Sequence, residues 1–480
     1  MSIKKWWLIG PLLVLLNLQS YAQQDKWDLK RCVEYAVSNN VSVKQQDVQA
    51  RLAELVFKQN KLSQIPSLSL NGNLSLNSGY TQNPQTFGLS TSTLYYNSYG
   101  LSSNVNFFNF NSLRNAIAGS KFAWQAANAA TENIRNNVSL NVANAYLNFL
   151  LTNEQAKTAE LQLRYSQASL ANTQRLVGAG SVPELNAAEL ESQVAQDSSA
   201  YITALSNVST AILNVKAYMS FDAAVEFVLD TPSVDKIPIE QLSNLQPDLV
   251  YNLALVNQPL QKADELNIKS ASKYVAASRA SMYPTFSLFG QLGSTYTNQT
   301  QELAGYNLVT PTFPLGNVTV SGNTYDVYQN AFQQPYYKNQ AYFSQLNTAF
   351  KQALGLSVNI PILSGGSLRT SWLRSKLNLR NYELQRDLDN LTLKQNIYQA
   401  YNLAVAAYQK SESNKKTVQA TQRSFEYAQK RYDVGLLNTI DLLTNQNNYF
   451  KAKNDLIYSQ FDFVFKMKVL EFYKGQGIKL

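Results

Sequence analysis

The stretch Pro66-Ser-Leu-Ser-Leu-Asn-Gly72 decides the fold of this chain, because its pattern occurs twice. It returns 218 positions later as Pro284-Thr-Phe-Ser-Leu-Phe-Gly290. In each copy a proline, which cannot continue a helix, is followed by alternating apolar and polar residues. Alternation of this kind is typical of a β-strand. We therefore expect Pro66 and Pro284 to lie at two equivalent junctions, where a helix stops and a strand begins.

Further matched pairs show that a whole half of the chain is repeated. Gly100-Leu101-Ser102 recurs as Gly355-Leu356-Ser357, 255 positions on. Val177-Gly178 recurs as Val434-Gly435, 257 positions on. A period this long does not fit a solenoid, and indicates one duplicated structural unit.

The duplication sets the expected domain organisation. We expect a first repeat over 23–220, a proline-containing linker over 221–247 and a second repeat over 248–480. The offset between matched positions grows between Gly290 and Gly355, so about 37 extra residues belong to the second repeat alone.

The first 22 residues have the features of a secretory signal peptide. Lys4 and Lys5 precede an apolar run from Trp6 to Leu18, and Ser20-Tyr21-Ala22 fits the small-x-small cleavage pattern. The alternative is a retained membrane helix, but the apolar run is shorter than the ~20 residues that span a bilayer. We expect 1–22 to be removed and the rest to be exported.

The composition argues against several classes of function. The chain has no histidine, so Ser-His and Cys-His nucleophiles are absent and a transition-metal site is not expected. The single cysteine, Cys32, lies too far from the cleavage site to be a lipid anchor and is expected to be a half-buried small side chain. The formal charge of +9 comes from scattered Lys and Arg, which indicates a solvated surface and no nucleic-acid partner. No cofactor is expected.

Two segments are predicted to form very long helices. Neither Gly nor Pro occurs between Gly119 and Gly178, or between Gly366 and Gly435. At 1.5 Å per residue, each helix would be on the order of 90–100 Å long. Apolar residues recur at the three- and four-residue spacing of packed helices. Each long helix is expected to turn back into a second one, giving helical hairpins over about 111–219 and 367–473.

Each expected hairpin has a glycine-containing turn, over 177–184 and 434–441. Glycine closes a helix in the left-handed conformation. Ser181 precedes Glu184 by three residues, which is the spacing of a capping box that starts the returning helix. In the second turn, Asn438 is the expected N-cap.

Four segments are predicted to be β-strands, because apolar and polar residues alternate in them. Length and rhythm fit membrane-spanning strands, with aromatic residues at their ends. The alternative is a soluble sandwich, but two isolated hairpins have no second sheet to pack against. The expected strands are about 67–80, 99–108, 285–297 and 352–362, and the segments 81–95 and 298–351 are expected to be solvent-facing loops.

Four strands in one chain do not close a barrel, and lipid does not tolerate an open sheet edge. The chain is therefore expected to form an oligomer, in which two copies supply 8 strands and three supply 12. Twelve strands leave an open lumen, whereas eight fill their interior with side chains. The sequence thus favours a channel through an outer membrane with a long helical extension.

The duplicated plan of helix, two strands and helical hairpin resembles the TolC family of outer membrane efflux proteins. So do the prolines that enter the strands and the Val-Gly turns, which have an acidic residue and a leucine six residues after the glycine. The resemblance covers about 27–473. It implies a homotrimer with a 12-stranded barrel in the outer membrane of a Gram-negative bacterium and a helical tunnel in the periplasm. It also implies a periplasmic adaptor and an inner-membrane RND or ABC pump as partners, and no chemistry of its own.

The resemblance also implies roles for residues at the two turns. Tyr432 corresponds to a gate tyrosine, and Glu184 and Asp441 to acidic residues near the aperture. Where some family members have an arginine, this chain has Leu437, with Arg431 as a candidate replacement. The turn residues Val177, Gly178, Val434 and Gly435 would contact the adaptor.

The residues themselves allow simpler interpretations of this site. Glu184 and Asp441 each lie in the first turn of a helix, where a carboxylate is favoured by the helix dipole whatever its function. Tyr432 would equally suit helix packing. Two other classes of protein also remain open, a periplasmic coiled-coil adaptor or scaffold without a channel and a secreted enzyme that uses paired carboxylates. The first leaves the four strands unexplained, and no acidic pair stands at a strand end to support the second.

Overall fold

The computed structural model describes residues 26–82, 87–234 and 237–475, so the predicted signal peptide lies outside the described residues. The chain divides into two compact units. Within the described residues, the helical unit contains 26–55, 120–271 and 378–475. The strand unit contains 56–119 and 272–377. Each unit therefore combines segments of both sequence repeats.

The helices of the two repeats match in order and in length, which confirms the duplicated fold. The pairs have 11, 22, 67 and 36 residues. In the first repeat they are α1 (Leu29–Asn39), α2 (Val41–Leu62), α3 (Ser112–Gly178) and α4 (Glu184–Met219). In the second they are α5 (Pro247–Asn257), α6 (Pro259–Ala280), α8 (Ser367–Asp433) and α9 (Thr439–Lys474).

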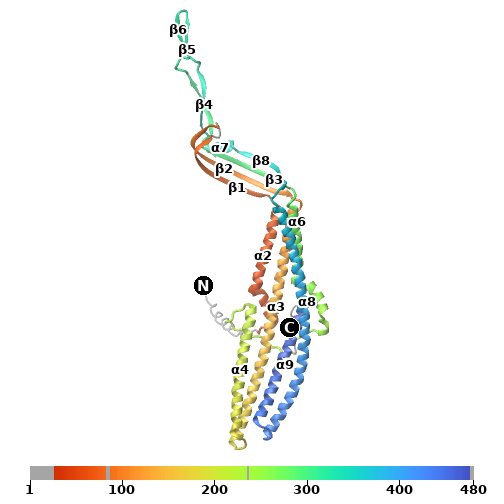
Figure 1. Ribbon diagram of the computed structural model, residues 1–480. Helices are drawn as coiled ribbons and strands as arrows, with labels where there is room; N and C mark the ends of the chain where they lie inside the picture. The colour runs from red at the N-terminus through yellow and green to blue at the C-terminus, as the bar shows by residue number, and fades with distance from the viewer. Residues whose placement is uncertain (1–25, 83–86, 235–236, 476–480) are drawn as a thin grey trace, which may run out of the picture. The chain divides into compact units, whose positions relative to one another are not determined.

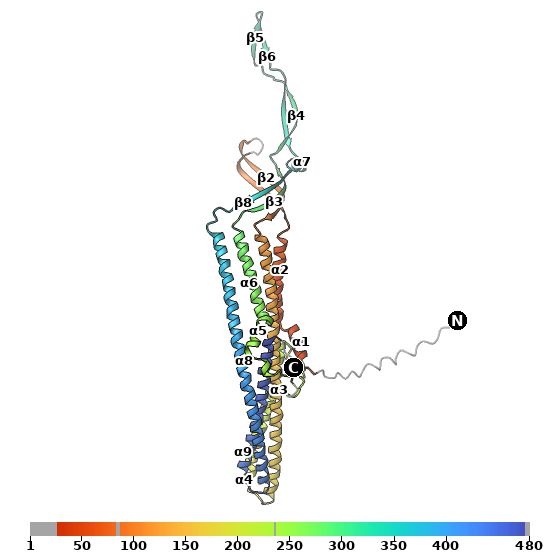
Figure 2. The ribbon, with the colours of Figure 1, turned by 90° about the vertical axis from the view of Figure 1, so that its right-hand side faces the viewer.

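In the helical unit, α3, α4, α8 and α9 run side by side as two hairpins (Figures 1 and 2). Buried residues recur every three or four positions along each helix, as in Ala187 and Leu190 on α4. One core cluster lies among α1, α3, α4 and α9, and includes Cys32, Tyr146 and Met219. Cys32 is fully buried rather than half-buried as expected, and burial raises the pKa of its thiol to about 12. Among the described residues, none of the helices has both the length and the mean hydropathy of a bilayer-spanning helix.

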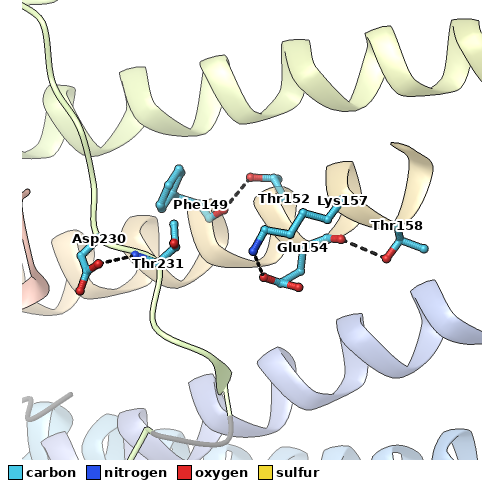
Figure 3. A network of polar contacts seen from close by, with 7 residues as sticks. All are labelled: Phe149, Thr152, Glu154, Lys157, Thr158, Asp230 and Thr231. Carbon is cyan, nitrogen blue, oxygen red and sulfur yellow. Dashed lines mark hydrogen bonds and ion pairs between the residues drawn. The ribbon is translucent and has the colours of Figure 1, made fainter. Parts of the chain in front are cut away.

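The linker between the repeats packs on the helices and is fixed there by polar contacts. The Tyr146 hydroxyl of α3 donates to the Asp230 carbonyl at 2.8 Å. Figure 3 shows Asp230 and Thr231 passing beside α3, where Glu154 and Lys157 form an ion pair at 2.6 Å. Phe227, Leu229 and Ile237 of the linker join the core cluster, which accounts for its position.

Two buried lysines of the long hairpins also hold the linker. Lys216, near the end of α4, donates to the carbonyls of Ala223 and Val225 at 2.8 and 2.5 Å. Lys468 of α9 pairs with Glu471 at 2.8 Å and donates to the Pro238 carbonyl at 2.6 Å. The lysine charges thus meet carbonyl and carboxylate oxygens, as buried charges require. Near its end the segment forms a 3-10 turn, Leu242–Asn244.

A pair of carboxyl groups lies between α6 and α8 in the helical unit. Burial, and then the neighbouring Asp389 carboxyl that hydrogen-bonds to it, raise the pKa of Asp264 to about 6, although Arg386 opposes the shift. Asp264 is only 7% exposed. Because the folded-state pKa lies above the ordinary value of 3.8, protonated Asp264 favours the folded state, and this contribution is lost as the pH rises from about 4 through 6.

The predicted quantity is the free energy of unfolding of Asp264→Asn minus that of wild type. We expect this difference to be about 2 kcal/mol larger at pH 8 than at pH 4. The amide keeps the shape of the side chain and removes the buried charge. Thermal unfolding at the two pH values measures the difference. Asp455→Asn, which changes an exposed carboxylate on α9, is the control and should show no such divergence. Parallel curves for Asp264→Asn and wild type would contradict the prediction.

In the strand unit, four antiparallel strands form one sheet in the order β1-β2-β3-β8. The strands are β1 (Ser67–Gln82), β2 (Leu89–Phe108), β3 (Thr285–Thr297) and β8 (Lys351–Asn359). All four overlap the expected strands, although β8 ends before Ile360 and Ile362. β1 and β8 are the two edges, and each has one side without a partner strand within the described part of the chain.

Both predicted loops are wrong in part. The loop expected at 81–95 is much shorter, since β2 begins at Leu89 and pairs there with Gln82. Its Ser and Thr residues resemble a loop in composition but alternate as a strand. The loop expected at 298–351 contains two strand pairs and a short helix. These are β4 (Gln301–Val309) with β7 (Phe332–Asn339), β5 (Gly316–Val320) with β6 (Asn323–Val327), and α7 (Tyr342–Thr348).

Candidate functional site

The register of the sheet separates two faces of different chemistry. Residues directly opposite in an antiparallel pair point to the same side. Leu70 lies opposite Leu101, which lies opposite Leu292, whereas Asn71 lies opposite Gly100. One face therefore presents Leu68, Leu70, Leu74, Leu76, Leu101, Val105, Leu288, Leu292, Leu354, Leu356 and Val358, and the other presents Ser67, Ser69, Asn71, Asn73, Ser75, Ser102, Ser287, Gln291 and Ser357.

The apolar face of this sheet is open in the single chain. Leu70, Leu74 and Leu354 are 76, 77 and 80% exposed. Pro66 and Pro284 stand directly before β1 and β3, a few residues after α2 and α6 end, so they lie at the junctions where they were predicted. A sheet with one apolar face, one polar face and two open edges is suited to a membrane once further strands close it.

The first helical turn closes differently from the prediction. Gly178 is the last residue of α3, and Gly180 adopts the left-handed conformation with φ of 71°. The Ser181 amide donates back to the Leu176 carbonyl at 2.9 Å, which completes a Schellman-type ending. The expected capping box is wrong, because Pro183 is the N-cap of α4 and no side chain caps that helix. Glu184 is thus the exposed first residue of α4.

The second turn follows the prediction closely. Gly435 has φ of 75°, and the Leu436 amide donates to the Arg431 carbonyl at 2.8 Å. Asn438 caps α9, since its side-chain oxygen accepts from the Asp441 amide at 2.8 Å. The Asn438 amide group donates in return to the Asp441 carboxylate at 2.9 Å. Asp441 is exposed and is part of this cap.

Tyr432 joins the two hairpins within the helical unit. It is 7% exposed and packs in a small cluster with Phe425, Ala428 and Leu442. Its hydroxyl lies 2.9 Å from the Thr173 hydroxyl of α3, in a buried contact. The Tyr432 side chain thus both packs in an apolar cluster and forms a hydrogen bond between helices.

The position of the missing arginine has apolar surroundings. Leu437 packs partly buried against the cluster that contains Tyr432. Arg431 donates from its guanidinium to the Leu436 carbonyl at 3.3 Å, so it supports the end of α8. Its contact is with the backbone of its own turn, and a role as a substitute for the arginine stays a prediction.

The tips of both hairpins expose apolar side chains. Leu185 is 65% exposed, and Val434, Leu436 and Ile440 are 68, 68 and 61% exposed. Gly178 and Gly435 present only backbone, with open space where a side chain would be. Exposed apolar groups clustered around accessible backbone are typical of a surface that another protein covers.

A buried polar network above the turns was missed in the sequence. Asp197 of α4 is 4% exposed, and its carboxylate accepts from Gln162 at 2.8 Å, from Gln193 at 2.9 Å and from Ser166. Gln446 of α9 donates to the Ser166 hydroxyl at 2.8 Å. The network therefore connects α3, α4 and α9, and all of its members except the partly buried Gln162 are buried.

One signal in the sequence points to this network. Ala187, Leu190, Gln193 and Asp197 follow the three- and four-residue spacing of the buried stripe of α4. A carboxylate on such a stripe must find hydrogen-bond donors from neighbouring helices. The residues that supply them were not identifiable before the helices were placed together.

Comparisons with known proteins agree with this architecture. The family model described as outer membrane efflux protein matches residues 33–220 and 250–460, once in each repeat. Among solved structures, a membrane protein from Pseudomonas aeruginosa has a TM-score of 0.72 at 15% identity, covering 94% of this chain and 92% of that chain. The Campylobacter jejuni CmeC outer membrane channel has a TM-score of 0.71 at 16% identity, covering 94% of this chain and 86% of that chain. The open state of the Neisseria gonorrhoeae MtrE outer membrane channel has a TM-score of 0.68 at 16% identity, covering 94% of this chain and 88% of that chain. A comparison with curated proteins finds no match.

The fold and the family model together define the class, an outer membrane channel with a periplasmic extension. The chain belongs to the outer membrane efflux protein family. It is a transport protein, and the alternatives of an enzyme and of a scaffold without a channel are set aside. Channels of this family form trimers in efflux systems.

Proposed function

We propose that three copies of this chain close a 12-stranded barrel, which opens into a helical tunnel and serves as the passive exit duct of a tripartite efflux or secretion system. The observation that carries the proposal is the four-stranded sheet with two chemically distinct faces and two open edges. In this arrangement β8 of one subunit pairs with β1 of the next, so no strand edge remains exposed to lipid.

The two faces of the sheet assign the inside and the outside of the barrel. The leucine-rich face that includes Leu70 and Leu354 meets lipid. The face of Ser, Asn and Gln that includes Asn71 lines an aqueous lumen, because its hydroxyl and amide groups need hydrogen-bond partners. Such a lumen is polar and carries few charges, which suits passage of chemically varied cargo.

The helical turns form the periplasmic end of the tunnel in this proposal. The exposed apolar residues around Val434 and Leu185 support their role as the surface that a periplasmic adaptor covers. Val177, Gly178 and Gly435 complete that surface with accessible backbone. An inner-membrane pump of the RND or ABC class would supply the energy.

The aperture is assigned to Glu184 and Asp441, with Tyr432 as the side chain that holds the neighbouring helices together. Both carboxylates are exposed at the first turn of a helix. Under threefold symmetry they form two rings of three charges, which attract cations in the manner of charged rings in pores.

The test is planar-bilayer conductance of the purified mature protein against the double variant Glu184→Gln and Asp441→Asn. These changes remove charge while keeping side-chain size, and the Asp441→Asn amide keeps an oxygen that can accept from Asn438. We expect small cation-selective currents in wild type, and loss of most of that selectivity in the double variant. The reversal potential in a salt gradient measures the change.

The control is Glu191→Gln, which removes an exposed carboxylate of α4 away from the turns. It should leave selectivity as in wild type. If the double variant also behaves as wild type, the carboxylates stabilise helix ends only. Failure of the protein to insert as an oligomer would contradict the barrel itself.

A further inference from the structure

The second repeat carries an extension without a counterpart in the first. It occupies residues 298–341, between β3 and α7, and contains the strand pairs β4–β7 and β5–β6 (Figure 1). It accounts for the extra residues that distinguish the second repeat. Every residue of β5, β6 and β7 is exposed in the single chain.

The base of the extension is fixed to the sheet. The Asn298 side chain accepts from the Tyr95 amide at 2.9 Å and donates to the Thr93 carbonyl at 3.0 Å. Gln299 donates to the Ser92 hydroxyl at 2.7 Å. These bonds tie the start of the extension to β2, so it leaves the sheet in a defined place.

The β5–β6 pair has one apolar face and one polar face. Val318 lies opposite Tyr325, and Val320 and Val327 point to the same side. Asn317 lies opposite Asp326 on the other side, next to the pair Thr319 and Thr324. The alternation is that of a strand pair with one covered face.

The β4–β7 pair divides less cleanly than the β5–β6 pair. Its apolar face presents Leu303, Tyr306 and Leu308 from β4, with Tyr337 opposite Leu303. The other face is mixed, because it carries the Glu302–Lys338 ion pair at 3.3 Å together with Tyr336 and the opposed pair Val309 and Phe332. Tyr306, Leu308 and Tyr337 are 57, 69 and 58% exposed. An isolated two-stranded pair is marginally stable in water, so these faces need a cover.

The charge of the extension indicates what covers it. Between Leu303 and Tyr337 the only charged residue is Asp326, which lies on the polar face. The apolar faces therefore have no cation for an anionic lipid headgroup and no charge pattern for a charged partner. Identical copies of such a face approach one another without electrostatic repulsion.

We propose that the extensions of three subunits pack their apolar faces together around the threefold axis and form a collar beyond the extracellular end of the barrel. This inference rests on the proposed trimer, which brings one extension from each subunit to the same end. It is continuous with the subunit interface, because the extension connects β3 to β8, and β8 is the edge that pairs with the next subunit. The occupant of the apolar face is thus a second copy of this chain.

The test is cross-linking of single cysteines in the full-length trimer. Cys32 is the only cysteine, so Cys32→Ala provides a background without thiols. Val318→Cys and Tyr325→Cys each place one thiol on the apolar face. Asn317→Cys and Asp326→Cys are the matched controls, one residue away on the polar face. Each variant is treated with a short thiol-to-thiol cross-linker and separated on a denaturing gel.

We expect the two apolar-face variants to give covalent dimers several-fold more efficiently than the two controls. Equal cross-linking on both faces, or none on the apolar face, would overturn the collar. Light scattering and bilayer conductance of the same samples separate the two proposals. A conducting trimer without apolar-face cross-links overturns the collar alone, whereas a protein that forms no trimer overturns the proposed function and the collar together.

Discussion

Replacement of Asp197 by alanine is expected to destabilise the folded protein by about 3 kcal/mol and to loosen the helical tunnel. The change removes the shared acceptor of Gln162, Gln193 and Ser166, in a place where Asp197 is 4% exposed. A buried donor without a partner costs about 1–3 kcal/mol. Gln193 and Ser166 lose their carboxylate acceptor in the interior, whereas the partly buried Gln162 keeps Asn447 as an acceptor at 3.3 Å. The midpoint of thermal or chemical unfolding measures the loss.

The same variant should also change the channel, because Ser166 connects the carboxylate to Gln446 on α9. With that connection weakened, α9 is held less firmly against α3 and α4, and single-channel currents should become larger and more variable. Glu191→Ala, which removes an exposed carboxylate from the same helix, should change stability by less than about 0.5 kcal/mol. An Asp197→Ala protein with wild-type unfolding and wild-type currents would show that the network is incidental.

Substitutions at neighbouring positions of β1 are expected to have opposite outcomes. Leu70→Lys places a charge on the apolar face of the sheet, at a cost of about 2–4 kcal/mol if it lies near the bilayer midplane. Asn71→Lys places the same charge on the polar face, where water solvates it. Leu70→Lys should therefore reduce the yield of inserted trimer severely, while Asn71→Lys inserts and shifts selectivity toward anions.

The comparison is controlled internally, because both variants introduce one lysine into the same strand. The fraction of protein that folds into lipid vesicles measures the first effect, and the reversal potential measures the second. Equal insertion of the two variants would mean that the face of Leu70 does not meet lipid. Loss of insertion in Asn71→Lys alone would reverse the assignment of the inside and the outside of the barrel.

Much of the fold follows from features that the sequence carries locally. The uninterrupted segments that end at Gly178 and Gly435 give helices within a few residues of their expected ends, because glycine and proline are local signals. Alternation in 67–80 and 285–297 gives strands for the same reason. Asn438 was identifiable as a cap, since the residue type and its distance from Asp441 are both visible in the chain.

Other features depend on partners that are distant in sequence. Ser181 has the residue type and spacing of a cap, yet the tight ending at Gly180 leaves Pro183 in that position. Within 298–351, β4 and β7 pair across an interruption of more than twenty residues, which no local pattern indicates. β5 and β6 pair across the two-residue turn Ser321-Gly322, a local signal that the polar composition of the segment obscured. Asp197 accepts hydrogen bonds from donors on α3 and α4, and its network extends to α9. No local pattern in the sequence identifies all of these hydrogen-bond partners.

The matched helices of the two repeats are equal in length, yet corresponding residues in them can differ. At the offset of 257, Asp197 corresponds to Asn454 in the second hairpin, so a buried carboxylate in one hairpin is a neutral amide in the other. Six separate identical hairpins would have to share every residue, and a change in one would be a change in all. Joining two copies in one gene removes that constraint, so that the two hairpins can evolve different contacts, as Asp197 and Asn454 show.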